Sequence, residues 1–181
     1  MHITWLGQTA VKIQTKHLEE DIVTLIDAYR PKKGDFPRNL SAHLALFSQG
    51  GDNAITITGD PFVIETLCEC DTKGMLITST PGPEGTTLYK LSAEGLTVVH
   101  LGVLHQKLNE HMIESIGRVD ILIIPVGGGT RYLSPSEAAQ TVTQLEPRIV
   151  IAVGFASDTD PDAAGIEAFI KELGIKPEPT D

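Results

Sequence analysis

Short runs of alternating apolar and polar residues fill the first half of the chain, a pattern typical of half-buried β-strands. Turn-forming residues such as Gly7, Gly34 and Pro61 separate these runs. Short strands at regular spacing favour packed sheets. The strands predicted for this half are Ile3–Leu6, Ala10–Gln14, Ile22–Ile26, Leu44–Phe47, Ile55–Thr58, Phe62–Leu67 and Met75–Thr78.

Four further strands are predicted in the second half. Thr87–Leu91 and Leu96–Leu101 are expected to pair as a hairpin, with the turn at Ser92–Gly95. Ile121–Val126 is apolar at every position, as a strand covered on both faces would be. Ile149–Val153 is the last predicted strand.

Three helices are predicted between and after these strands. For the first, apolar residues recur at every fourth position from Leu104 to Ile116, and Gly117 is the expected stop. The second begins with an N-cap at Ser134, a proline at the next position and a capping box completed by Glu137. The predicted buried stripes are Ala138, Val142 and Leu145 in the second helix, and Ile166, Phe169, Ile170 and Leu173 in the third.

Many strands followed by alternating strand and helix favour two sheets with helices outside, a four-layer αββα sandwich in the α/β class. A chain of 181 residues fits one domain, which we place at residues 1–175. Residues 176–181 combine two prolines with two acidic residues, and a mobile tail is expected there.

The charge balance is acidic, with 24 Asp and Glu against 14 Lys and Arg. Because no run of basic residues could neutralise several phosphates at once, neither nucleic acid nor an anionic membrane is an expected partner. No secretion signal and no apolar run of about 20 residues is present, so a cytoplasmic location is expected. Cys68 and Cys70 lie two positions apart on one face of an extended run, which disfavours a disulfide. They are expected to be reduced and to pack against a sheet. The alternative is that the two thiols bind a soft metal ion.

Several segments, taken in order, are similar to a known family. Ile3–Ile13 resembles the first hairpin of short bacterial metal-dependent hydrolases related to ascorbate-6-phosphate lactonase, in the metallo-β-lactamase superfamily. Thr24–Tyr29 resembles their second conserved strand. The resemblance spans nearly the whole chain and implies the metallo-β-lactamase fold. Its second half is carried by Leu88–Leu91, Glu94–Leu96, His100–Gly102, Val119–Gly129 and Pro147–Val153.

Members of that family hold one or two divalent metals, usually zinc, manganese or iron. The resemblance implies a His-x-His-x-Asp-His loop, a later histidine, a bridging aspartate and a final histidine. Of these positions, only the one occupied by Asp52 keeps a ligand type. The matching positions are Gln49, Gly51, Asp52 and Asn53 in the loop, Glu84 near the later histidine, Val103 for the bridging aspartate and Gly154 for the final histidine.

A catalytic zinc needs about three protein ligands and an open water position. The positions named above offer far fewer metal ligands than this. The leading hypothesis is therefore a metal-free, non-catalytic protein without a cofactor. Such a protein would bind a small molecule or a protein in a regulatory or assembly role. The alternative is a hydrolase of a small anionic metabolite that uses zinc or another divalent metal at a non-standard site. The family's habit of forming oligomers implies possible self-association.

The remaining polar residues allow two interpretations each. His100 and His105 flank Val103 and could rebuild a metal site with Asp52 or Asp27; otherwise His100 is a hydrogen-bonded core residue and His105 is exposed. Gly127–Gly129 and Arg131 precede a helix and could meet an anion, or the glycines simply make a tight turn. Residues given no ligand role are Gln8, at a position where the family often has histidine, His111 on a solvated helix face, and the scattered His2, His17 and His43.

Overall fold

The computed structural model describes residues 1–37 and 39–176. Its strands are β1 (His2–Gly7), β2 (Ala10–His17), β3 (Glu20–Ile26), β4 (Asn39–Ser41), β5 (Leu44–Leu46), β6 (Thr56–Thr58), β7 (Phe62–Ile64), β8 (Glu69–Thr72), β9 (Met75–Pro81), β10 (Thr87–Ala93), β11 (Leu96–His100), β12 (Ile121–Pro125) and β13 (Ile149–Val153). Its helices are α1 (Glu110–Ile116), α2 (Pro135–Leu145) and α3 (Ile166–Leu173), with a short 3-10 turn, η1 (Pro83–Gly85).

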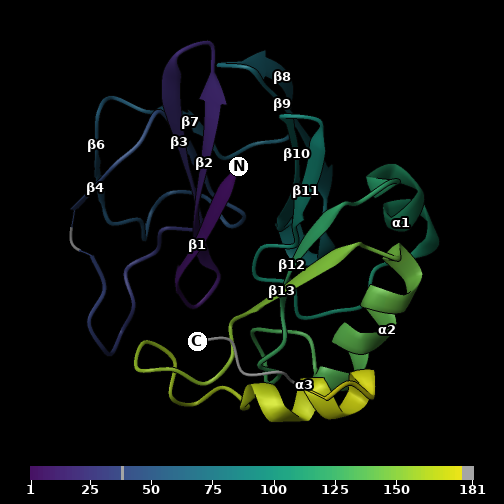
Figure 1. The fold of residues 1–181 in the computed structure, drawn as a ribbon. Helices are drawn as coiled ribbons and strands as arrows, with labels where there is room; N and C mark the ends of the chain where they lie inside the picture. Colours follow the sequence, from purple (N-terminus) through teal and green to yellow (C-terminus); the bar gives the residue numbers. More distant parts are fainter. Residues whose placement is uncertain (38, 177–181) are drawn as a thin grey trace.

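Two sheets face each other (Figure 1). The first has the strand order β1-β2-β3-β5-β7, and the second has the order β13-β12-β11-β10-β9-β8. Antiparallel hairpins start each sheet, whereas β3-β5-β7 and β11-β12-β13 are parallel. Because parallel strands have their carboxyl ends at the same edge of a sheet, the loops that follow these strands meet at one edge of each sheet. In open α/β sheets, ligands bind at this edge.

The strand β12 contributes side chains to two different apolar clusters, one on each of its faces. Ile121 and Ile123 belong to the apolar cluster between the two sheets. Leu122 and Ile124, on the opposite face, belong to the cluster under the helices. Because successive side chains of a strand point to opposite faces, a strand covered on both sides is apolar throughout. The prediction for this segment is confirmed.

The three helices pack against the outer face of the second sheet, with α1 and α2 on the right of Figure 1 and α3 along the bottom. The capping box of α2 is confirmed, since the Ser134 hydroxyl accepts the Glu137 N–H at 3.3 Å and the Glu137 carboxylate accepts the Ser134 N–H at 3.1 Å. Gly174 ends α3 in a left-handed conformation with φ 67°. The predicted fold class and the helical layer over this sheet are confirmed.

The layer over the first sheet is built differently. A third apolar cluster there joins Leu25 of β3 to Ala42 and Ile55, which flank the small two-stranded sheet of β4 and β6. Within the described residues, extended chain covers this face in place of a helix. A run of alternating, turn-rich residues cannot present the wide apolar stripe that a covering helix needs. The strand β4 was not among those predicted from the sequence.

The first predicted helix was too long. It begins at Glu110 and not at Leu104, because the Asn109 side chain accepts the Met112 N–H at 2.9 Å and so caps the helix late. Leu104 and Leu108 are buried as predicted, but by a loop that folds onto the second sheet. Burial at every fourth position therefore did not require a helix. The predicted tail lies outside the described residues, except for Lys176.

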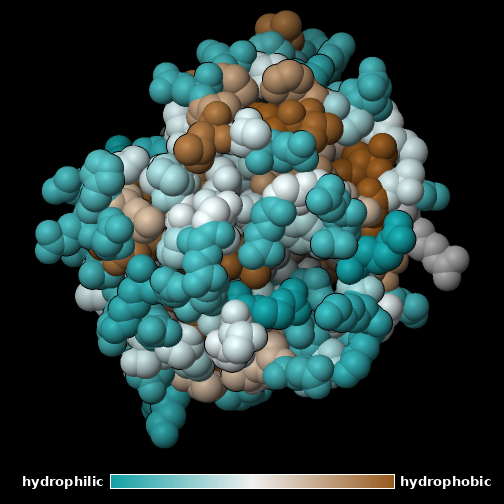
Figure 2. Space-filling view, turned by 180° about the vertical axis from the view of Figure 1, so that it is seen from behind, coloured by the Kyte–Doolittle hydropathy of each residue, from teal (hydrophilic) through white to brown (hydrophobic). Residues whose placement is uncertain are grey.

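Apolar and polar residues are unevenly distributed over the surface. Seen from behind, apolar residues gather in the upper half, while polar and charged residues cover most of the lower half (Figure 2). No helix in the described part of the chain is long and apolar enough to cross a membrane. Exposed large apolar side chains include Leu18, Phe62, Val63 and Leu67.

Candidate functional site

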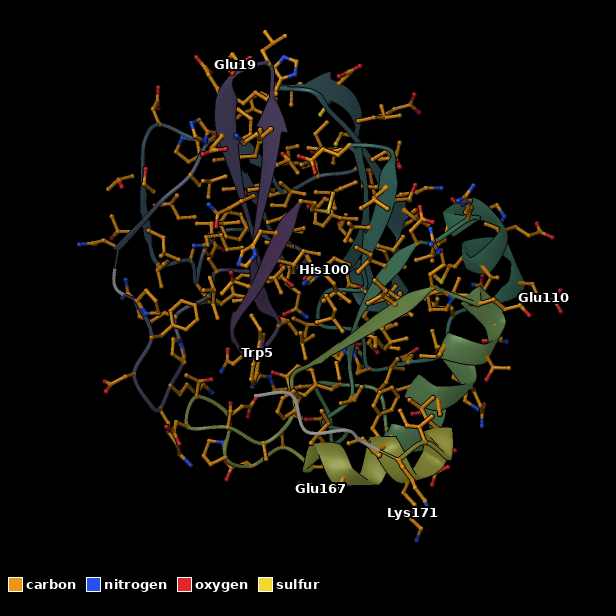
Figure 3. All side chains as sticks on the ribbon, in the orientation of Figure 1. Trp5, Glu19, His100, Glu110, Glu167 and Lys171 are labelled. Carbon is orange, nitrogen blue, oxygen red and sulfur yellow. The ribbon has the colours of Figure 1, made fainter. Side chains whose placement is uncertain are left out.

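A network of buried polar groups lies between the sheets, below the loops at their carboxyl ends. Asp27, just after β3, accepts the Ser48 N–H at 2.7 Å and the Ser48 hydroxyl at 2.8 Å. His100 ends β11, and its Nε2 lies 2.9 Å from the Thr9 carbonyl oxygen. Its Nδ1 accepts the Gly102 N–H at 3.0 Å. Figure 3 shows His100 in the interior, between the two sheets.

These bonds fix the charge of the histidine. Because Nδ1 of His100 accepts a hydrogen bond, its proton must sit on Nε2, and the ring is neutral. Burial lowers the pKa of His100, an effect that the Asp27 carboxyl 4.0 Å away partly opposes. Burial also raises the pKa of Asp27, against the attraction of His100 and the Ser48 hydrogen bonds. The interpretation of His100 as a hydrogen-bonded core residue is confirmed.

Ser48 does not complete a catalytic triad with these groups. Its hydroxyl donates to Asp27, whereas a nucleophilic serine would donate to a histidine base. The Ser48 side chain is also buried, so no substrate atom could reach it. The network therefore ties the ends of β3, β5 and β11 together.

A cleft of about 600 Å³ opens above this network. Gln8 and Val103, both buried, form part of its floor. Gln49 and Asn53 form part of its rim. Two facing loops complete it, residues 29–33 after β3 and residues 159–162 after β13, together with Arg131. Four of the positions singled out from the sequence thus lie together: Gln8, Gln49, Asn53 and Val103.

Gly154 is not among the residues that line this cleft. Its backbone has φ +63°, and a Cβ there would lie 3.1 Å from Cε1 and 3.2 Å from Cζ of Tyr132. The Tyr132 ring is buried, and its hydroxyl donates to Asp160 at 2.6 Å. Asp160 also accepts a hydrogen bond from Arg131 at 3.0 Å. A side chain at position 154 would therefore press against the ring of a buried tyrosine.

The other predicted positions lie outside the cleft. Gly51 donates its N–H to Glu65 at 3.0 Å, and Asp52 is exposed to solvent. Glu84 pairs with His105, whose Nε2 lies 3.3 Å from a carboxylate oxygen of Glu84. That side chain of His105 is 20% exposed, more buried than expected.

The remaining histidines and the cysteines have separate surroundings. His111 is exposed on α1, as predicted. The Nδ1 atom of His43 accepts the Val23 N–H at 3.0 Å. Cys68 and Cys70 are free thiols that pack at the margin of the core between the sheets, which confirms the expected packing.

Comparison with known proteins identifies the family. The sequence pattern of the family described as the Beta-lactamase superfamily domain matches residues 2–154, most of the chain. The chain belongs to this superfamily. A UPF0173 metal-dependent hydrolase from Thermococcus onnurineus is 33% identical over 91 residues, which cover 50% of this chain and 40% of that protein. The matched segment thus spans less than half of that relative's length.

Solved structures of other proteins share the fold. One from Thermotoga maritima, of the metallo-β-lactamase superfamily, superposes with a TM-score of 0.77 at 23% identity, covering 93% of this chain and 84% of that one. The metallo hydrolase Igni18 from Ignicoccus hospitalis gives a TM-score of 0.64 at 14% identity, covering 95% and 89%. At these identities the likeness concerns the fold alone.

The residues of this β-lactamase superfamily member do not fit the metal centre that the sequence resemblance implies. At the cleft floor, Val103 offers an alkyl side chain where a bridging ligand is expected. Gln8 and Gln49 offer neutral amides, which are not among the usual zinc ligands. Across the described residues, no three His, Cys, Asp or Glu side chains come together in an arrangement that could hold a metal ion.

Several site residues of this superfamily member were not predicted. Ser48 and Arg30 follow buried strands, and a polar residue at that place is a usable signal in an α/β fold. Tyr132 and Asp160 gave no such signal, because only the folded chain brings them against Gly154 and Arg131.

The glycines before α2 make a tight turn, as one interpretation held. The Gly128 N–H donates to the Leu133 carbonyl at 2.9 Å, and a Cβ on Gly127 would collide with the Gly154 carbonyl.

Proposed function

We propose that this protein is a non-catalytic member of the β-lactamase superfamily whose cleft binds a partner without hydrolysing it. The observation that carries the proposal is Val103 at the cleft floor. A valine has no lone pair to donate to a metal, and it stands where the resemblance expects a bridging aspartate. The backbone and surroundings of Gly154 support the same conclusion, because a side chain there would be strained at φ +63° and its Cβ would lie 3.1 Å from the Tyr132 ring.

Hydrolysis by the family route depends on a metal that makes hydroxide available near neutral pH. Bound to zinc, water has a pKa of about 7, far below the pKa of water in bulk. The buried groups below the cleft do not substitute for this effect, since Ser48 and His100 are engaged in internal hydrogen bonds. The cleft is consequently better suited to recognition than to bond cleavage.

The proposal is tested by the metal content of protein purified without chelators from zinc-supplemented and manganese-supplemented cultures. We expect well below one equivalent of zinc, manganese or iron, and an unchanged unfolding temperature after EDTA treatment, because a metal bound to the folded state would stabilise it. Stoichiometric metal would overturn the proposal.

The alternative is a hydrolase that uses a metal at a non-standard site, and the relative's description as a metal-dependent hydrolase supports it. Asp52→Ala and His105→Ala variants probe it, because these are the most accessible candidate ligands. Metal content that falls in either variant would favour that alternative. Self-association remains a separate prediction that light scattering tests.

A further inference from the structure

The cleft concentrates positive charge in a chain of opposite sign. The formal net charge is -10, from 14 Lys and Arg against 24 Asp and Glu. Of these residues, four basic and two acidic ones line the cleft. Three of the basic residues come from one loop and the fourth from the turn before α2, so folding is needed only to bring the fourth to the other three. They are Arg30, Lys32, Lys33 and Arg131.

Two of these cations already have internal partners. Arg131 lies 3.0 Å from Asp160, a buried carboxylate that also accepts the Tyr132 hydroxyl. Lys33 lies 3.2 Å from Asp162, but its side chain is 59% exposed and that of Asp162 is 83% exposed. Such exposed pairs contribute about 0 to 1 kcal/mol and separate readily when a ligand competes.

The other two cations face the cleft without such a partner. Neither Arg30 nor Lys32 forms an ion pair within residues 1–37 and 39–176. Their loop is nevertheless held in place, since the Arg30 N–H donates to the Asn53 carbonyl at 2.8 Å. A fixed loop with unneutralised guanidinium and ammonium groups matches the charge of an oxyanion, and guanidinium also matches its geometry.

Neutral amides lie beside these cations. Gln49 and Asn53 stand on the rim, and no hydrogen bond from either side chain to a described residue is present. Gln8 on the floor donates to the Thr159 carbonyl at 3.0 Å, which fixes the direction of its amide. Amide groups can donate to or accept from the uncharged part of a polar ligand.

We propose that this cleft binds a small polar molecule that carries a multiply charged oxyanion, either a phosphate ester or a polycarboxylate. Arg30 and Lys32 bind the anionic group, and Arg131 contributes after partial release from Asp160. Gln49 and Asn53 contact the rest of the molecule. A volume of about 600 Å³ suits a small metabolite and not a polymer. The proposal deepens the proposed function by giving a ligand class to the same cleft.

The test is a titration of the full chain with sodium phosphate and, separately, with sodium citrate. Binding is followed by calorimetry and by backbone amide shifts, with sodium chloride keeping the ionic strength constant. We expect saturable binding that perturbs Gln49, Asn53 and Val103. The double variant Arg30→Gln/Lys32→Gln should weaken binding about tenfold or more. Its matched control, Lys73→Gln/Lys171→Gln, removes the same charge away from the cleft and should bind within about twofold of wild type.

Binding of phosphate alone, of citrate alone or of both supports the proposal and identifies the preferred anionic group. The proposal is overturned if neither phosphate nor citrate binds saturably. It is also overturned if both double variants lose the same amount of binding affinity. Metal analysis on the same samples separates the two proposals. Metal-loaded protein that still binds an anion through Arg30 and Lys32 refutes the non-catalytic role and supports the anion site. Metal-free protein that binds neither probe refutes only the anion site.

Discussion

The site has two layers that differ in how fully their polar groups are used. In the buried layer, the side chains of Asp27, Ser48 and His100 all make hydrogen bonds, and each is almost completely shielded from solvent. In the exposed layer, Gln49 and Asn53 lie on the rim of an open cleft. The first layer joins the two sheets, whereas the second faces whatever enters the cleft.

The difference indicates which positions of the site can be substituted at little cost in stability. A buried hydrogen-bonding group that loses its partner costs about 1 to 3 kcal/mol, so each member of the lower layer constrains the others. A rim side chain without internal partners can change with little effect on folding. A site of this construction can alter what it recognises while its support stays the same.

The largest effect on stability is expected from Asp27→Ala. It removes the acceptor for both Ser48 groups and puts alanine at a position with φ 53°, which together should lower the free energy of unfolding by about 3 kcal/mol. Asp27→Asn is the matched control, because it keeps one acceptor and tolerates this backbone conformation. Urea unfolding measures both, and equal losses would contradict the assigned role of the hydrogen bonds.

A histidine at position 154 is expected to cost somewhat less. Gly154→His places a side chain at φ +63° and against the Tyr132 ring, which should lower the free energy of unfolding by about 2 kcal/mol. In a Tyr132→Ala background the added cost should be smaller, because the ring is gone. Strictly additive losses in the double variant would show that the ring does not close this position.

The pH dependence of stability isolates His100. The pKa of His100 is lowered in the folded state, so below its ordinary value of about 6.5 the unfolded chain binds the extra proton and stability falls as pH falls. The raised pKa of Asp27 acts in the opposite direction, because its contribution is lost as pH rises.

Urea midpoints between about pH 7 and pH 5 should therefore fall on acidification in the wild type, whereas they should stay level or rise in His100→Asn, where of these two effects only that of Asp27 remains. The variant should be less stable at neutral pH, since it loses the fit to Thr9 and Gly102. Parallel pH profiles would show that His100 is not held neutral.

The smallest effect is expected in the exposed layer. Gln49→Ala and Asn53→Ala should each change the free energy of unfolding by no more than about 0.5 kcal/mol, because neither side chain is buried. Chemical denaturation of the two single variants and their double tests this. A loss comparable with that of Asp27→Ala would remove the distinction between the layers.

Parts of the structure with a local cause were predictable from the sequence. The apolar run Ile121–Val126 marked a strand with two covered faces, and Ser134 with Glu137 marked a helix start. The start of α1 was misplaced because burial of Leu104 and Leu108 imitates a helical stripe, although a loop buries them. Periodicity reports which side chains are buried and not which backbone buries them.

The candidate site was predictable only in part. Val103 and Gln49, two of the positions named from the resemblance, line the same cleft, whereas Glu84 lies elsewhere, paired with His105. Three of the four cations of the cleft are close together in the sequence, at Arg30–Lys33, but the fourth, Arg131, is distant and joins them only in the folded chain. Convergence of separated loops depends on tertiary structure, which a single sequence does not display.

The packing of Tyr132 on Gly154 limits the order in which mutations can accumulate in this lineage. A side chain at position 154 becomes less costly once residue 132 has become smaller. A smaller residue 132 also removes the hydroxyl that holds Asp160, the counter-ion of Arg131. The first step toward a new ligand at position 154 would thus disturb the existing cleft before any benefit arises, so that route of adaptation passes through a disadvantaged intermediate.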